Sequence, residues 1–215
     1  MKVITCYTDS HIPLLAQHYL PSLPAGFEAE LIHLPQECPS GEYMGDGWTS
    51  TVRRKLEIIR AACLSESRAF LLCDADVRFY PGAEKLTPGA PGNSDVSFQD
   101  HGDGQMCTGF VFINPNARSH ALFDHALSVL DEKKDDQLAV NAVLSSSSVG
   151  WGIVTTKVWA YGQQLRKNGE AWHVWEPGMP LEPPAGLLVH HASWTKGIAN
   201  KLAMLDEVRR IRDGR

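Results

Sequence analysis

Hydrophobic and polar positions change their spacing several times in the first hundred residues, and each spacing predicts a different element. Residues 2–7 form a short apolar run, and residues 27–34 alternate apolar and polar side chains with the period of two that is typical of a strand. Across residues 48–64 the apolar positions recur every three or four residues, which predicts an amphipathic helix. The continuous apolar run at residues 69–73 is typical of a central strand that is covered on both faces.

The rest of the chain predicts a similar mixture of elements. A first helix is expected around Leu14 and Tyr19, and later elements follow: strands at 95–99 and 109–113, and helices at 119–130, 137–144 and 196–211. Residues 151–194 show no regular period. Because strands and helices alternate in the first half, the sequence predicts an α/β fold with parallel strands. At 215 residues the chain is long enough to bury one core, so we predict a single domain spanning residues 1–215.

Composition narrows the class of protein further. Hydrophobic residues make up 43% and charged residues 21% of the chain, which is typical of a soluble globular protein and excludes wholesale disorder. The net charge of −5 argues against non-specific binding to nucleic acids or to anionic membranes, which need a basic face. The five cysteines are scattered without a C-x-x-C pair, so neither a disulfide framework nor a cysteine zinc site is expected. No signal-peptide core and no membrane-spanning apolar run is visible, and we expect a cytoplasmic protein.

Two carboxylates follow the predicted central strand, at the edge of the sheet where ligands bind in α/β folds. Asp74 and Asp76 are two positions apart, so in extended chain they point to the same side. Like charges this close are unfavourable unless a cation or basic groups offset them. Carboxylate oxygens favour Mg²⁺ or Mn²⁺, which also bind phosphate. The alternative is a solvated turn, and the buried strand beforehand makes us favour the metal site.

The other candidate residues each have two interpretations, one functional and one structural. His190 and His191 follow an apolar run, and either imidazole is a reasonable third ligand for Mn²⁺ or a structural side chain. Asp136 belongs to an acidic pair that opens a predicted helix, where helix capping is an equally good explanation. Lys196 and Lys201 flank the start of the last helix, which suggests a phosphate cradle or a solvated surface.

Tryptophans are concentrated near the C-terminus. Five of the six fall within residues 151–194. Aromatic faces stack on sugars, but they also fill cores. We expect an aromatic-lined cleft in this part of the chain, with Trp151 and Trp194 as candidates for binding an acceptor.

Four motifs stand in a fixed order along the chain: D-A-D at 74–76, C-T-G-F-V-F-I-N-P at 107–115, D-Q-x-x-x-N at 136–141 and H-A-S-W-T-K-G at 191–197. Together they resemble the nucleotide-diphospho-sugar transferases with a GT-A fold, especially the retaining enzymes related to plant and bacterial α-galactosyl- and xylosyltransferases. The resemblance covers roughly residues 48–202, and the ordered set is far more specific than any single motif. It implies a GT-A, Rossmann-like mixed sheet that is mostly parallel and flanked by helices.

The resemblance also implies roles for individual residues. Asp74, Asp76 and His191 would hold Mn²⁺ or Mg²⁺, and Asp136 and Gln137 would act at the donor sugar as catalytic residues. The donor would be bound by Thr8, Asp9, Lys55, Asp74, Ala75, Asp76, Thr108, Gly109, Lys196, Gly197 and Lys201. The sequence departs from the family pattern at Cys107, where an asparagine is common.

From these motifs we expect a metal-dependent glycosyltransferase. It would move a sugar from a nucleoside-diphosphate sugar, most simply a UDP-sugar, to the hydroxyl of a glycan or other acceptor, and the resemblance implies retention at the anomeric carbon. Residues up to about 105 would form the donor half and residues 106–215 the acceptor half. The alternatives are a haloacid-dehalogenase-like phosphatase, whose D-x-D normally follows the first strand, and a non-catalytic nucleotide-sugar-binding module.

Overall fold

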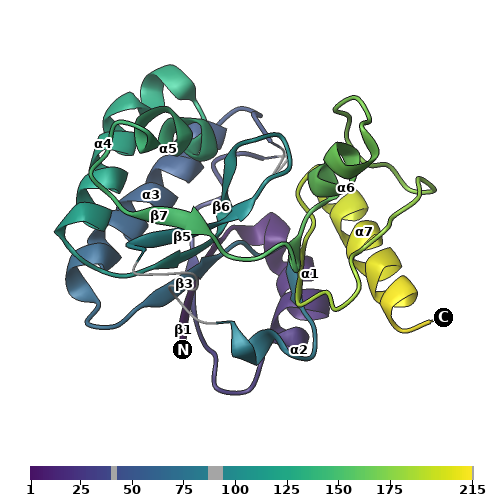
Figure 1. Cartoon of the computed structure of the whole chain (residues 1–215). Helices are drawn as coiled ribbons and strands as arrows, with labels where there is room; N and C mark the ends of the chain where they lie inside the picture. The colour runs from purple at the N-terminus through teal and green to yellow at the C-terminus, as the bar shows by residue number, and fades with distance from the viewer. Residues whose placement is uncertain (40–42, 87–93, 215) are drawn as a thin grey trace.

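The computed structural model describes residues 1–39, 43–86 and 94–214, and it has the layered α/β architecture that the sequence predicts (Figure 1). Its main sheet has six strands in the order β2-β1-β3-β6-β5-β7. These are β1 (Lys2–Tyr7), β2 (Glu28–His33), β3 (Phe70–Cys73), β5 (Val96–Asp100), β6 (Met106–Ile113) and β7 (Trp151–Ile153). Neighbouring strands are parallel except where they meet β6, which is antiparallel to both β3 and β5.

Alternating residues of the central strands supply two separate cores. Phe70 and Leu72 of β3 join the cluster that contains Leu56 of the long helix, whereas Leu71 and Cys73 join the cluster on the other side. All four residues of β3 are buried. The continuous apolar run therefore has the cause that the sequence suggested, because both faces of this strand are covered.

Helices cover the two faces unequally. On one face lie α3 (Trp48–Ser65), α4 (Ala117–Lys133) and α5 (Asp136–Leu144), which pack against one another (Figure 1). On the other lie the short helical turns of residues 9–22, including α1 (Ile12–Leu14) and α2 (Leu20–Ser22), with the C-terminal α7 (Ile198–Arg212) beyond them (Figure 1). The apolar face of α7 packs with Trp175 and with α6 (Tyr161–Asn168) in a third core cluster.

A second, three-stranded sheet brings the C-terminal part of the chain to the end of β3. Its order is β4-β9-β8, formed by β4 (Val77–Phe79), β9 (Val189–His191) and β8 (Val158–Trp159). Strand β4 begins one residue after Asp76 and pairs antiparallel with β9, so that Val77 lies opposite His191. This pairing carries His191 to the two carboxylates.

The fold class and most of the predicted elements are confirmed, with differences of a few residues at their ends. The prediction that residues 151–194 are irregular is wrong in part, because β7, β8, α6 and β9 lie within them. Strands of two or three residues are too short to show a period in sequence. Within the described residues, Cys6, Cys63, Cys73 and Cys107 form no disulfide. In the described ranges, no helix is both long and apolar enough to cross a bilayer.

Candidate functional site

The D-A-D motif lies where the sequence places it, directly after β3. The backbone N–H of Asp74 donates to the carbonyl of Gly109 at 2.8 Å, which extends the β3–β6 pairing by one residue. The N–H of Ala192 donates to the carbonyl of Asp76 at 2.9 Å and fixes the motif to the end of β9. The main sheet therefore holds the first residue of the motif and the second sheet holds its last residue.

A cavity of about 420 Å³ opens over this motif, within the usual range for small-molecule sites. It brings together almost all of the predicted site residues: Thr8, Lys55, Asp74, Ala75, Asp76, Thr108, Gly109, Asp136, Gln137, His191, Trp194, Lys196, Gly197 and Lys201. Two predicted residues do not line it. Asp9 is paired with His33 on the surface at 2.8 Å, and Trp151 is exposed on the edge strand β7. The lining comes from both sides of residue 105, so the division into a donor half and an acceptor half stays a prediction.

Asp74, Asp76 and His191 form a group that fits a divalent cation. One ligand atom from each lies within 4.8 Å of the others, and two carboxylate oxygens with one imidazole nitrogen suit Mn²⁺ or Mg²⁺. Gly109 makes room beside them, because a Cβ there would lie 2.4 Å from Cε1 of His191 and 2.6 Å from Oδ2 of Asp74. His190, the other candidate ligand, is fully buried against Trp159 with ring centroids 5.2 Å apart.

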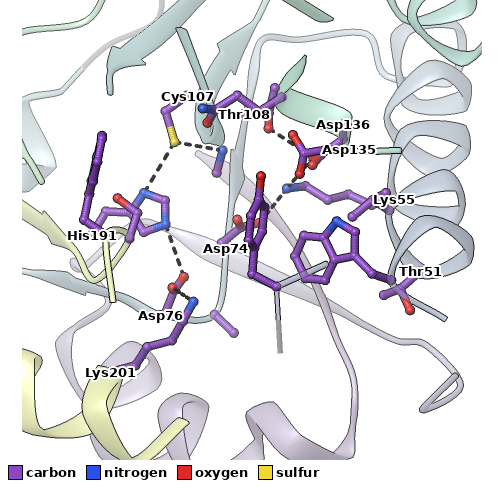
Figure 2. A pocket seen from close by; sticks show the side chains of 18 of the residues that line it. Thr51, Lys55, Asp74, Asp76, Cys107, Thr108, Asp135, Asp136, His191 and Lys201 are labelled. Carbon is purple, nitrogen blue, oxygen red and sulfur yellow. Dashed lines mark hydrogen bonds and ion pairs between the residues drawn. The ribbon is translucent and has the colours of Figure 1, made fainter. Parts of the chain in front are cut away.

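Opposite charges surround the buried carboxylate of Asp76, which is 3% exposed. Its Oδ1 lies 3.3 Å from Nε2 of His191, and Lys201 of α7 pairs with Oδ2 (Figure 2). Burial alone would raise the pKa of Asp76, but these two cationic partners hold it well below its usual range. For His191 the effect of burial is the opposite, because burial alone would lower its pKa. The charge of Asp76 outweighs burial and raises the pKa of His191 to about 10. Positive charge is thus already concentrated where an anion with its cation would bind.

Lys55 of α3 links the motif to the start of α5. Its Nζ lies 2.8 Å from Oδ1 of Asp74 and 3.0 Å from Oδ2 of Asp136, and Thr108 donates to the same Asp136 oxygen at 3.0 Å (Figure 2). Burial lowers the pKa of Lys55, but the charges of Asp136 and Asp74 raise it well above its usual value. Lys55 and Thr108 therefore bind the same oxygen of Asp136, and both are residues for which the family resemblance implied donor binding.

The acidic pair before α5 has two different environments. Asp135 caps the helix, because its Oδ1 accepts from the N–H of Leu138 at 2.9 Å. Burial and the neighbouring charge of Asp136 raise the pKa of Asp135 to about 6. The capping interpretation is therefore correct for Asp135. Asp136 and Gln137 line the cavity.

Sequence reasoning missed the residue behind His191. Gln99, the next-to-last residue of β5, is fully buried, and its Oε1 lies 2.8 Å from Nδ1 of His191. A carboxamide oxygen only accepts, so the imidazole donates from Nδ1 and leaves Nε2 facing Asp76. The thiol of Cys107 lies 3.6 Å from the same Nδ1 and accepts from the N–H of Gly109. A glutamine ending a buried strand was the one available signal.

Of three comparisons with known proteins, only the comparison with solved structures finds matches. No protein-family model matches the chain, and no curated protein matches it in sequence. Solved structures do match. The galactosyltransferase LgtC, in complex with donor and acceptor sugar analogs, is 13% identical with a TM-score of 0.56, covering 90% of this chain and 87% of LgtC. A glycosyltransferase involved in glycosylating the major capsid of PBCV-1 is 12% identical with a TM-score of 0.57, covering 96% of this chain and 98% of that one.

The glycosyltransferase GlyE of Streptococcus pneumoniae TIGR4 matches equally well, at 12% identity and a TM-score of 0.57. The match covers 98% of this chain and 63% of GlyE, so the chain spans about three fifths of that protein. This chain has a GT-A fold. In it the D-x-D motif follows β3 of the GT-A sheet, the third of its strands along the chain and not the first.

Proposed function

We propose that this protein is a metal-dependent glycosyltransferase that moves a sugar from a nucleoside-diphosphate sugar, UDP-linked most simply, to an acceptor hydroxyl. The observation that carries the proposal is that one cavity brings together three kinds of group. They are the cation-binding group of Asp74, Asp76 and His191, the buried carboxylate of Asp136, and the lysines Lys55, Lys196 and Lys201. The residues of the cation-binding group and the carboxylate come from three of the four motifs, and Lys55 and Lys201 lie outside them. The GT-A fold is the second support, because the structures that share it include three kinds of glycosyltransferase.

The donor diphosphate would lie between the carboxylates and the start of α7. Asp74, Asp76 and His191 would hold Mn²⁺ or Mg²⁺, which when bound supplies Lewis-acid stabilisation of the charge on the leaving diphosphate. Lys196 and Gly197 precede α7 and line the cavity, where an ammonium group and helix N–H groups favour phosphate. Lys201 adds a further cation on the first turn.

The donor sugar would lie against Thr108, Asp136 and Gln137. Asp136 is held by Lys55 and Thr108, so it is fixed in position to accept hydrogen bonds from sugar hydroxyls. Gln137 donates from Nε2 to Gln105 at 3.3 Å, which presents its carboxamide to the same cavity. An oxocarbenium-like transition state is stabilised by such oxygens. Retention rests on the motif resemblance, and NMR of the product anomer tests it.

Two measurements test the proposal. Isothermal titration calorimetry with UDP should show binding in Mn²⁺ that is lost with a chelator, and Asp76→Asn should weaken this binding at least tenfold, about 1.4 kcal/mol. Release of UDP from a panel of UDP-sugars should follow, since slow hydrolysis suffices to show activation of the anomeric bond. Failure of UDP, GDP and related nucleotides to bind would refute the transferase function.

Each alternative gives a different result. A phosphatase would release phosphate from p-nitrophenyl phosphate and lose that activity in Asp74→Asn, because Asp74 would be its nucleophile. A binding module would bind the nucleotide with Mn²⁺ and release no UDP from any sugar donor. Either pattern replaces the proposed function with the corresponding one.

A further inference from the structure

An aromatic stack leads from the cavity to the surface of the molecule. His101 and Trp194 both line the cavity and stack with ring centroids 4.8 Å apart and planes at 27°. Trp172 packs on Trp194 with centroids 5.4 Å apart and planes at 30°. Trp172 itself lies outside the cavity lining and is 50% exposed. The stack thus presents an indole to solvent directly beside the candidate site.

The middle member of the stack is held in an uncommon backbone conformation. Trp194 has φ of +65°, a region that bulky residues rarely adopt. Its Nε1 donates to the carbonyl of His101 at 2.9 Å, and Gly162 leaves the space, since a Cβ there would lie 2.4 Å from that nitrogen. Strain of this kind persists only where the surroundings fix it, and it is concentrated at ligand sites.

Hydrogen bonds also hold the segment that carries Trp172. The next residue, His173, bonds through Nε2 to the hydroxyl of Tyr161 at 2.9 Å and through Nδ1 to the carbonyl of Ala171 at 2.8 Å. Two residues further on, the N–H of Trp175 donates to the carbonyl of Trp194 at 2.7 Å. These hydrogen bonds fix the backbone next to Trp172, and its side chain remains exposed on that fixed segment.

A polar group stands beside this apolar surface. Ser193 lines the cavity next to Trp194, and within the described residues its buried hydroxyl has no hydrogen-bond partner. A buried hydroxyl without a partner is costly, and a ligand hydroxyl would relieve that cost. An aromatic face next to an unpartnered hydroxyl matches the chemistry of a sugar ring, which has apolar C–H faces and hydroxyls at its rim.

We propose that Trp172 is a stacking platform for a sugar ring of the acceptor beyond the one that receives the transferred sugar. The acceptor is then a saccharide of at least two units, whose terminal unit enters the cavity at Trp194 and whose next unit packs on Trp172. This inference rests on the proposed function, since it names the substrate class of the same site. It adds a residue that none of the four motifs contains.

The test uses the full chain with UDP and Mn²⁺ on an array of mono-, di- and trisaccharides. The wild type should bind at least one di- or trisaccharide more tightly than its terminal monosaccharide. Trp172→Ala should remove most of that preference, by about tenfold, whereas Trp172→Phe should retain part of it because a ring face remains. UDP binding with Mn²⁺ should be unchanged in both variants, which shows that they are folded and separates the platform from the donor site.

Trp151→Ala is the matched comparison, since Trp151 is also an exposed tryptophan (45%) but lies on the edge strand β7. Loss of the preference in Trp151→Ala with retention in Trp172→Ala would overturn the platform. Absence of any saccharide binding while UDP and Mn²⁺ still bind would also overturn it, and would leave the proposed function standing. Failure of UDP itself to bind would refute the proposed function and this inference together.

Discussion

Adding one methyl group at Gly109 should weaken metal binding strongly while leaving the fold in place. Gly109 lies in β6 beside the metal-ligand group, and its Cβ would lie 2.4 Å from Cε1 of His191 and 2.6 Å from Oδ2 of Asp74. Carbon atoms in contact normally lie about 3.5 Å apart or more. The imidazole must therefore move by about 1 Å, the difference between these separations, or the strand must shift.

A movement of that size is large for a metal site. Ligand distances in such sites hold within about 0.2 Å, so displacing His191 and Asp74 together leaves no arrangement that keeps both as ligands. His191 also has little room, because it is buried and bonded through Nδ1 to Gln99. We expect Gly109→Ala to lower Mn²⁺ affinity at least tenfold, and to cost about 1–3 kcal/mol of stability from overpacking.

Electron paramagnetic resonance of Mn²⁺ titrated with the protein measures the affinity without any activity. Gly152→Ala is the matched control, because Gly152 also lies in a strand of the main sheet and its Cβ would meet nothing closer than 3.4 Å. Thermal melts of both variants show that they are folded. If Gly109→Ala is folded and binds Mn²⁺ as the wild type does, the assignment of this site is wrong.

Three further predictions concern His191, its partner Gln99 and the pair of Asp95 with Arg118. His191→Ala should weaken Mn²⁺-dependent UDP binding at least about tenfold in calorimetry, whereas His190→Ala should lower Tm only; the reverse result would transfer the ligand role to His190. Gln99→Leu removes the acceptor of the His191 Nδ1 proton and should weaken Mn²⁺ binding about tenfold, and an unchanged affinity would contradict this. Hydrogen bonds from Arg118 lower the pKa of Asp95 to about 2. The ionised Asp95 therefore stabilises the fold at pH values above the ordinary Asp pKa, and this stabilisation is lost as the pH falls toward 2. Asp95→Asn should therefore cost up to about 2 kcal/mol in urea unfolding at pH 7 and close to nothing near pH 2, and an equal loss at both would contradict the reasoning.

The fold could be predicted largely because the composition of its central strands indicates whether one or both of their faces are buried. A strand such as β3 that is apolar at every position must be covered on both faces, and the second half of β6, residues 110–113, shows the same signature. The antiparallel direction of β6 has no such local signal, since strand direction depends on the path of the connection before it. The short strands β4 and β8 could not be predicted either, because their pairing with β9 and not their pattern makes them strands. The apolar run at residues 187–189 did indicate a strand, and β9 lies two residues further along.

The residue types at the candidate site could be predicted, whereas their partners could not. Asp74 and Asp76 are visible as a motif, but nothing near them indicates that Lys55 reaches one and Lys201 the other. Gln99 was missed for the same reason, because its function is defined by His191, 92 positions away along the chain. Motif reasoning finds ligands and overlooks the residues that orient them.

The charge around Asp76 shows why this gap matters for function. The sequence suggests that two carboxylates at one strand end need a cation, yet Lys201 and His191 already compensate Asp76 in the folded chain. The charge of Asp76 is therefore offset within the protein before anything binds. A divalent cation held by Asp74, Asp76 and His191 would need Nε2 of His191 without its proton, so its binding would release that proton and replace the ion pair between His191 and Asp76. Lys201 would then be available to an anion. Cation and diphosphate binding are then coupled through Asp76, so Mn²⁺ should raise the affinity for UDP, and UDP should raise the affinity for Mn²⁺ by the same factor.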